Sequence, residues 1–95
     1  MRNYELTVIF SPEIDEEDMG PAIDRVSQFV TQKGGDIVEV NRWGRRKLAY
    51  PIKNFREGEY ALIQLKLQPS QAAELEVDLR KGEEVLRYLL VRLEE

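Results

Sequence analysis

Two segments of the chain alternate between apolar and polar residues with a period of two. In residues 3–10 one face carries the apolar set Tyr4, Leu6, Val8 and Phe10. In residues 59–67 the corresponding set is Ala61, Ile63 and Leu65. A period of two is typical of a β-strand that packs one face on a core. We therefore predict a strand over each segment, with the other face of each strand pointing away from that core.

Apolar residues return at helical spacing in residues 16–33, which predicts an amphipathic helix. The stripe consists of Met19, Ala22, Ile23, Val26, Phe29 and Val30. Asp15 offers a side-chain oxygen as the N-terminal cap, and Gly34-Gly35 is expected to end the helix. Because proline removes a backbone donor, Pro21 predicts either a helix that begins near Met19 or a kink within a longer one.

A shorter helical stripe follows Pro69. It consists of Ala72, Leu75 and Leu79. Ser70 is expected to cap this helix, and Lys81-Gly82 is expected to end it.

The remaining strand-like segments are residues 36–52 and 85–93. The first is long for one strand, and Gly44 in its middle predicts a bulge or bend. Pro51 favours an edge strand, where a missing hydrogen-bond donor does less harm. A turn is expected over residues 54–58.

The order strand, helix, strand, strand, helix, strand predicts the α+β class. Short connections and right-handed crossovers favour a split βαβ sandwich (βαββαβ). Its four-stranded antiparallel sheet should have the order 4-1-3-2, with two helices on one face. At 95 residues the chain is expected to form one small domain over residues 1–95.

The sheet face turned away from the helices is expected to be partly apolar. The residues predicted there are Ile9, Tyr60, Leu62, Gln64, Leu89 and Val91. An open apolar face favours a protein partner, although scattered exposed apolar residues are also ordinary.

Composition excludes several kinds of catalytic site. The chain has no cysteine and no histidine, which excludes thiol catalysis, Ser-His-Asp triads and His- or Cys-ligated metals. The acids of residues 13–18 are more typical of a helix start than of a metal site, and no glycine loop matches a phosphate-binding pattern. We expect no enzymatic activity, no metal, no cofactor and no small-molecule substrate.

The chain also lacks the roughly 20 consecutive apolar residues that a membrane helix requires. Its N-terminal segment does not resemble a signal peptide. A cytoplasmic location is therefore expected, with no membrane association.

Residues 41–56, the basic segment, hold six of the fourteen basic residues and no acid, although the net charge of the chain is −4. Trp43, Tyr50 and Phe55 are interleaved with the cations. Cations bind phosphate oxygens and rings stack on bases, so the segment predicts a nucleic-acid ligand. The alternative is a solvated hairpin, but with no acid inside the segment no local ion pair is expected to neutralise it.

RNA-recognition domains share this order of elements but stack bases on aromatic residues of the third strand. Residues 58–65 here carry Leu62 and Leu65 where that motif requires rings. If RNA is bound, it should therefore be held by the basic segment, through recognition of a shaped RNA surface rather than single-strand stacking.

Residues 44–53 read Gly-Arg-Arg-Lys-Leu-Ala-Tyr-Pro-Ile-Lys. This run resembles the signature of the bacterial small-subunit ribosomal protein six family. The resemblance extends over nearly the whole chain, including the start Met-Arg-Asn-Tyr-Glu, the first turn at Ser11-Pro12 and the pair Glu57-Gly58.

This resemblance implies a ferredoxin-like fold and a structural role in the cytoplasmic ribosome. It further implies binding to the central domain of small-subunit (16S) ribosomal RNA, together with the eighteenth small-subunit protein. By position, Arg45, Arg46, Lys47 and Lys53 are the basic members of the signature, and Arg2 and Arg56 are looser candidates. Arg42, in the basic segment, completes the predicted RNA-binding set.

An alternative from a different functional class stays open. A domain of this fold can act as a regulatory or small-ligand-binding homodimer that associates through its sheet. That hypothesis predicts homodimers in solution and no affinity for RNA.

Overall fold

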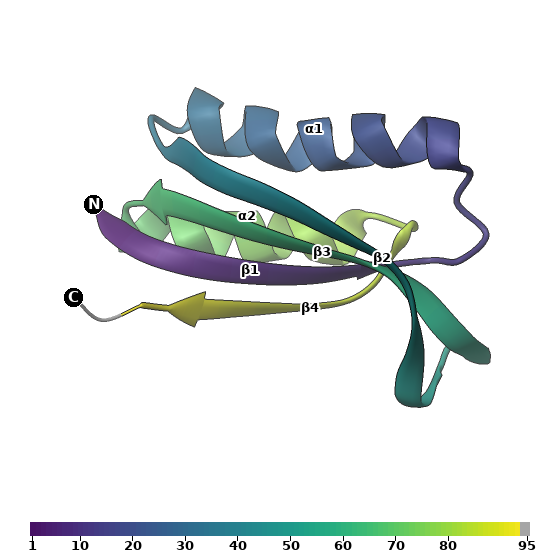
Figure 1. The fold of residues 1–95 in the computed structure, drawn as a ribbon. Coiled ribbons are helices and arrows are strands. Elements are labelled where there is room, and N and C mark those ends of the chain that lie inside the picture. The colour runs from purple at the N-terminus through teal and green to yellow at the C-terminus, as the bar shows by residue number, and fades with distance from the viewer. Residues whose placement is uncertain (94–95) are drawn as a thin grey trace.

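The computed structural model describes residues 1–93. In chain order its elements are β1 (Arg2–Phe10), α1 (Glu16–Gln32), β2 (Asp36–Ile52), β3 (Phe55–Leu67), α2 (Pro69–Lys81) and β4 (Val85–Arg92). The four strands form one antiparallel sheet in the order β2-β3-β1-β4. Figure 1 shows both helices on the same face of this sheet. The predicted ferredoxin-like fold and its strand order are therefore confirmed.

The core lies between the helices and this face of the sheet. The alternating residues predicted to face it are all buried, since Tyr4 is 7% exposed and the others are 0–1% exposed. From the helices, buried residues of α1 such as Met19 and Val30 and of α2 such as Leu75 complete the same cluster. Among residues 1–93 no helix is long and apolar enough to cross a bilayer.

Helix α1 begins at Glu16 and continues through Pro21. Asp15 is its N-cap residue, but the Asp15 side chain makes no cap hydrogen bond, so the predicted side-chain cap is wrong. The two glycines terminate the helix as predicted: its last residue is Gln32, Lys33 is the C-cap, and Gly34 follows with φ of +82°. The amide of Gly34 donates to Thr31 and that of Gly35 to Val30, which is the Schellman pattern.

Helix α2 begins two residues earlier than expected. Gln68 is its N-cap residue and Pro69 occupies the first helical position, so the predicted Ser70 cap is wrong. Proline suits this position because its missing donor would have no partner inside the helix. The predicted end at Gly82 is confirmed.

Strands β2 and β3 form a long hairpin whose turn is shorter than expected. Ile52 pairs directly with Phe55, and both turn residues have positive φ, +50° for Lys53 and +70° for Asn54. Such a two-residue turn matches the twist of the strands that it joins. The turn predicted over residues 54–58 is wrong because residues 55–58 belong to the β3 ladder.

The predicted irregularity at Gly44 is confirmed. Gly44 has φ of +81°, and the pairing of β2 with β3 shifts register between Arg42 and Gly44. Further shifts occur between Ile37 and Glu39 and between Lys47 and Ile52. Bulges strengthen the local twist of a ribbon, and Figure 1 shows the end of the hairpin curling away from the rest of the sheet.

Residues 46–58, the distal hairpin, extend past the last residue of β1, since Phe10 pairs with Glu59. Their base lies against the open face of the sheet, the face without helices. There the backbone of Gly58 contacts Ile9, with Leu48 close by. Ile9 points to the open face as expected, but the hairpin leaves it only 9% exposed. Its expected availability on an open surface is therefore wrong.

Candidate nucleic-acid interface

The hairpin presents the six cations of the basic segment on its exposed strands and at its turn. All six side chains are exposed, those of Arg42, Arg45, Arg46, Lys47, Lys53 and Arg56. Lys53 lies in the turn itself, and Arg56 follows it on β3. Within residues 1–93, neither these two nor Arg46 and Lys47 take part in an ion pair. Four positive charges on the distal hairpin are therefore available to an external anion.

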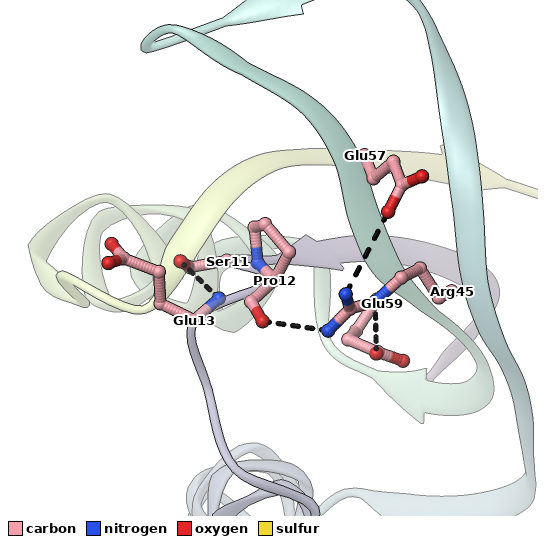
Figure 2. A network of polar contacts seen from close by, with 6 residues as sticks. All are labelled: Ser11, Pro12, Glu13, Arg45, Glu57 and Glu59. Atoms are coloured by element: carbon pink, nitrogen blue, oxygen red, sulfur yellow. Dashed lines mark hydrogen bonds and ion pairs between the residues drawn. The ribbon is translucent and has the colours of Figure 1, made fainter.

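Arg45 differs from its neighbours because acids surround it (Figure 2). Its Nε donates to Oε1 of Glu59 over 3.3 Å, and its NH1 lies 3.8 Å from Oε2 of Glu57. A third contact runs from NH2 to the carbonyl oxygen of Pro12, over 2.8 Å. The expectation that no local ion pair neutralises the basic segment is wrong for Arg45. The antiparallel register places Glu59 opposite Arg45, although fourteen residues separate them in sequence.

Arg2 is not part of this cluster. It pairs with Leu67 at the opposite end of the β1–β3 ladder from Glu59. At about 3.3 Å per residue, the eight residues of β3 from Leu67 to Glu59 offset Arg2 from Arg45 by roughly 26 Å along the strand direction. The fold therefore gathers the cations of residues 42–56 but leaves Arg2 apart from them.

The open face of the sheet exposes apolar side chains in the middle and on β4. Leu89 is 59% exposed and Val91 is 43% exposed, while Tyr60, Leu62 and Gln64 are half-buried. Trp43 also lies on this face, where its ring stacks on Tyr60 with centroids 6.4 Å apart and an angle of 10° between planes. Trp43 therefore packs on a neighbouring strand, although half of its surface stays exposed.

A groove of about 220 Å³ separates the distal hairpin from the rest of the open face. Its walls are mainly apolar, with Leu48 and Ile52 from the hairpin facing Ile9 and Leu89 from the sheet. Arg87 of β4 crosses this groove. Its guanidinium carbon lies 5.8 Å from the centroid of the Tyr50 ring, and the same group donates to the Tyr50 hydroxyl.

Reasoning from the sequence had not selected Arg87. The sequence feature that could have identified Arg87 is the alternation along β4, which places Arg87 on the same face as Leu89 and Val91. That the hairpin folds back far enough to meet it depends on tertiary structure. Within residues 1–93, no group of three or more acids is arranged to hold a metal ion.

Comparisons with known proteins agree with this architecture. A family model for ribosomal protein S6 matches residues 3–92. The chain is 38% identical over 95 residues to small ribosomal subunit protein bS6 of Moorella thermoacetica, covering 100% of this chain and 97% of that protein. It is 42% identical over 92 residues to bS6 of Beutenbergia cavernae, covering 97% and 96%.

A solved structure is similar in the same way. The crystal structure of 30S ribosomal protein S6 from Thermotoga maritima matches with a TM-score of 0.91 and 34% identity, covering 97% of this chain and 87% of that one. Sequence and fold therefore agree over nearly the full length of the chain, which belongs to the ribosomal protein S6 family.

Proposed function

We propose that this chain binds the central domain of 16S ribosomal RNA through its basic segment and the eighteenth small-subunit protein through its open sheet face. Membership of the ribosomal protein S6 family makes it a structural, non-enzymatic component of the small subunit in the cytoplasmic ribosome. The proposal adds the two surfaces by which it would hold its place in that particle.

The observation that carries the RNA proposal is the set of exposed, unpaired cations on the distal hairpin. Arg46, Lys47, Lys53 and Arg56 lie on a ribbon that projects beyond β1, so a large polyanion can reach them without meeting the helices. If each neutralises one phosphate, the slope of log K against log salt would be about −3 for single-stranded or irregular RNA.

Three candidate cations remain, and each has weaker support. Arg45 already contacts Glu57, Glu59 and Pro12. Arg42 lies nearer the centre of the sheet, opposite Ala61, and would extend the cationic strip along β2. Arg2 would reach phosphate only on an RNA that follows the length of the sheet, because it lies at the far end of β1.

Base stacking on the sheet is a poorer explanation of RNA binding. On the open face of β3 the only ring is Tyr60, followed by Leu62 and Gln64. One side of Tyr60 is already stacked against Trp43. This supports phosphate contacts on a shaped RNA surface over readout of unstacked bases.

The partner proposal depends on the exposed apolar residues of the open face. Leu89 and Val91 on β4, with Leu62 on β3, form an apolar area that is interrupted by Thr7 of β1 and that no helix covers. Burying such an area against another protein would remove it from water.

The RNA proposal is tested by measuring affinity for a central-domain fragment of 16S RNA between about 50 and 300 mM salt. The variant Arg46→Gln with Arg56→Gln removes two unpaired cations from the distal hairpin. We expect its affinity to fall at least tenfold and its salt slope to shrink by about 1.4, two contacts at about 0.7 each. Lys81→Gln, at the end of α2, is the control for a lost exposed charge. Equal affinities for the native chain and the double variant would overturn the assignment.

A further inference from the structure

The distal hairpin has little support of its own. Beyond the pairing of Phe10 with Glu59, residues 46–58 of β2 and β3 pair only with each other. An isolated two-stranded ribbon is marginally stable in water and twists strongly. Its direction relative to the sheet must therefore come from contacts with neighbouring elements.

On the open face, the apolar contacts that could fix the direction of the hairpin lie at its base. Gly58 lies against Ile9 with Leu48 close by, but farther out the groove of about 220 Å³ separates hairpin and sheet. Arg87 spans this space, with its guanidinium over the Tyr50 ring and a hydrogen bond to the Tyr50 hydroxyl. Arg87 pairs with Ile9 in the sheet, so it ties the outer hairpin to β4.

On the other face, Arg45 makes the equivalent contact. Arg45 pairs with Glu59, which in turn pairs with Phe10, so the side chains of these residues share one face of the sheet. Arg45 donates to the carbonyl oxygen of Pro12 in the β1–α1 connection. Its Nε donates to Glu59, and its NH1 forms an ion pair with Glu57, as Figure 2 shows. A phosphate that bound this guanidinium would compete with these three contacts.

We propose that Arg45 and Arg87 are positioning residues that hold the distal hairpin from its two faces, so that Arg46, Lys47, Lys53 and Arg56 present a fixed array to RNA. Arg45 then acts through the direction of the hairpin and not as a phosphate ligand. Only the RNA-binding test of this inference rests on the proposed function. The hairpin geometry is testable without RNA.

The first test is amide hydrogen exchange of the full chain without RNA. Tyr50→Phe removes the hydroxyl that Arg87 contacts and changes no charge, while Arg45→Met with Glu59→Gln removes the Arg45 contacts and keeps the net charge. In each of these two variants we expect amide exchange of residues 46–56 to accelerate at least threefold. This is the effect expected when about one exposed polar pair is lost. Exchange of the core amides of β1 should stay unchanged. Unaltered exchange in the hairpin would overturn the proposal.

The second test is the salt dependence of binding to the RNA fragment. For Arg45→Met with Glu59→Gln, a positioning role predicts a several-fold loss of affinity with the salt slope unchanged. A phosphate ligand would instead reduce the slope by about 0.7, as expected of the matched control Arg56→Gln. A reduced slope for the Arg45 variant would overturn its positioning role. If the native chain does not bind the RNA, the proposed function fails, whereas hydrogen exchange still decides whether the two arginines hold the hairpin.

Discussion

Gly58 and Ile9 are packed so closely that a side chain at position 58 would overlap Cγ2 of Ile9. The φ angle of Gly58 is not positive, so the requirement for glycine here is space and not backbone conformation. This contact brings the base of the hairpin onto the open face. It also explains why Ile9 is buried although no helix covers it.

The first prediction concerns this contact. Gly58→Ala should lower the free energy of unfolding by about 1–3 kcal/mol, because the added methyl group overpacks against Ile9 and the carbonyl of Phe10. Chemical denaturation measures the loss. Gly20→Ala is the control, since nothing lies within 4 Å of the added carbon apart from its chain neighbours and its own helix. That variant should change the free energy of unfolding by less than about 1 kcal/mol, because the gain in helix propensity is opposed by the contact of the new Cβ with the ring of Pro21.

A double variant tests whether Ile9 is the cause. Ile9→Ala alone should cost about 2–5 kcal/mol as a buried truncation. Combined with Gly58→Ala, the total should be smaller than the sum by at least about 1 kcal/mol, because the new methyl group fills the vacated space. Strict additivity would show that Gly58 is required for another reason.

The second prediction concerns the turn. Lys53 holds φ of +50°, a conformation that favours asparagine or glycine and costs other residues about 1–2 kcal/mol. Lys53→Asn should therefore raise the free energy of unfolding by up to about 1 kcal/mol while weakening RNA binding, because a hairpin cation is lost. Arg56→Gln, outside the turn, should weaken RNA binding similarly without the gain in stability. Denaturation and RNA titration of both variants measure these effects, and an Asn variant of lower stability would contradict the turn argument.

The third prediction addresses the open sheet face. Leu89 is 59% exposed there, and Val77 is 46% exposed on the outer side of α2. Leu89→Glu should weaken binding of the eighteenth small-subunit protein at least tenfold, because it places a charge in the proposed apolar contact. Val77→Glu should leave that binding unchanged. Calorimetric titration measures both affinities.

Sedimentation of the native chain and of Leu89→Glu separates this partner from a second copy of the chain. A native homodimer that Leu89→Glu dissociates would favour the regulatory homodimer over the ribosomal partner. A native monomer that loses only the heterologous partner would support the proposal.

The fourth prediction uses Trp43, the only tryptophan of the chain. Its ring is 49% exposed and stacks on Tyr60 at the open face. Binding of a protein to that face should shift its fluorescence emission to shorter wavelength, because the exposed half of the ring leaves water. RNA alone should leave the emission maximum unchanged. A strong quench by RNA without the partner would indicate that Trp43 stacks on a base instead.

Much of the fold follows from the local pattern of residues. Alternation at Leu6 and Ile63 predicted which strand faces meet the core, and spacing around Val26 and Leu75 predicted the helices. The four strands and two helices then left few topologies, and the strand order is the predicted one. Burial of a stripe is decided by its period, so these predictions needed no knowledge of distant contacts.

Helix starts were less predictable, for a local reason. Asp15 and Ser70 have suitable capping side chains, but neither is used that way. The first helical turn can begin at any of several neighbouring residues at similar cost. The backbone around Pro69 then favours a start that no side-chain cap marks.

The charge count of residues 41–56 correctly located a basic segment, and by itself the sequence determined its composition, the core faces and the family signature. Only the tertiary structure decided how those charges are used. The register of β2 on β3 brings Glu57 and Glu59 to Arg45, and the curl of the hairpin buries Ile9 and carries Tyr50 to Arg87. Pairing between strands and the direction of a twisted ribbon depend on contacts far apart in sequence, which periodicity and composition do not encode.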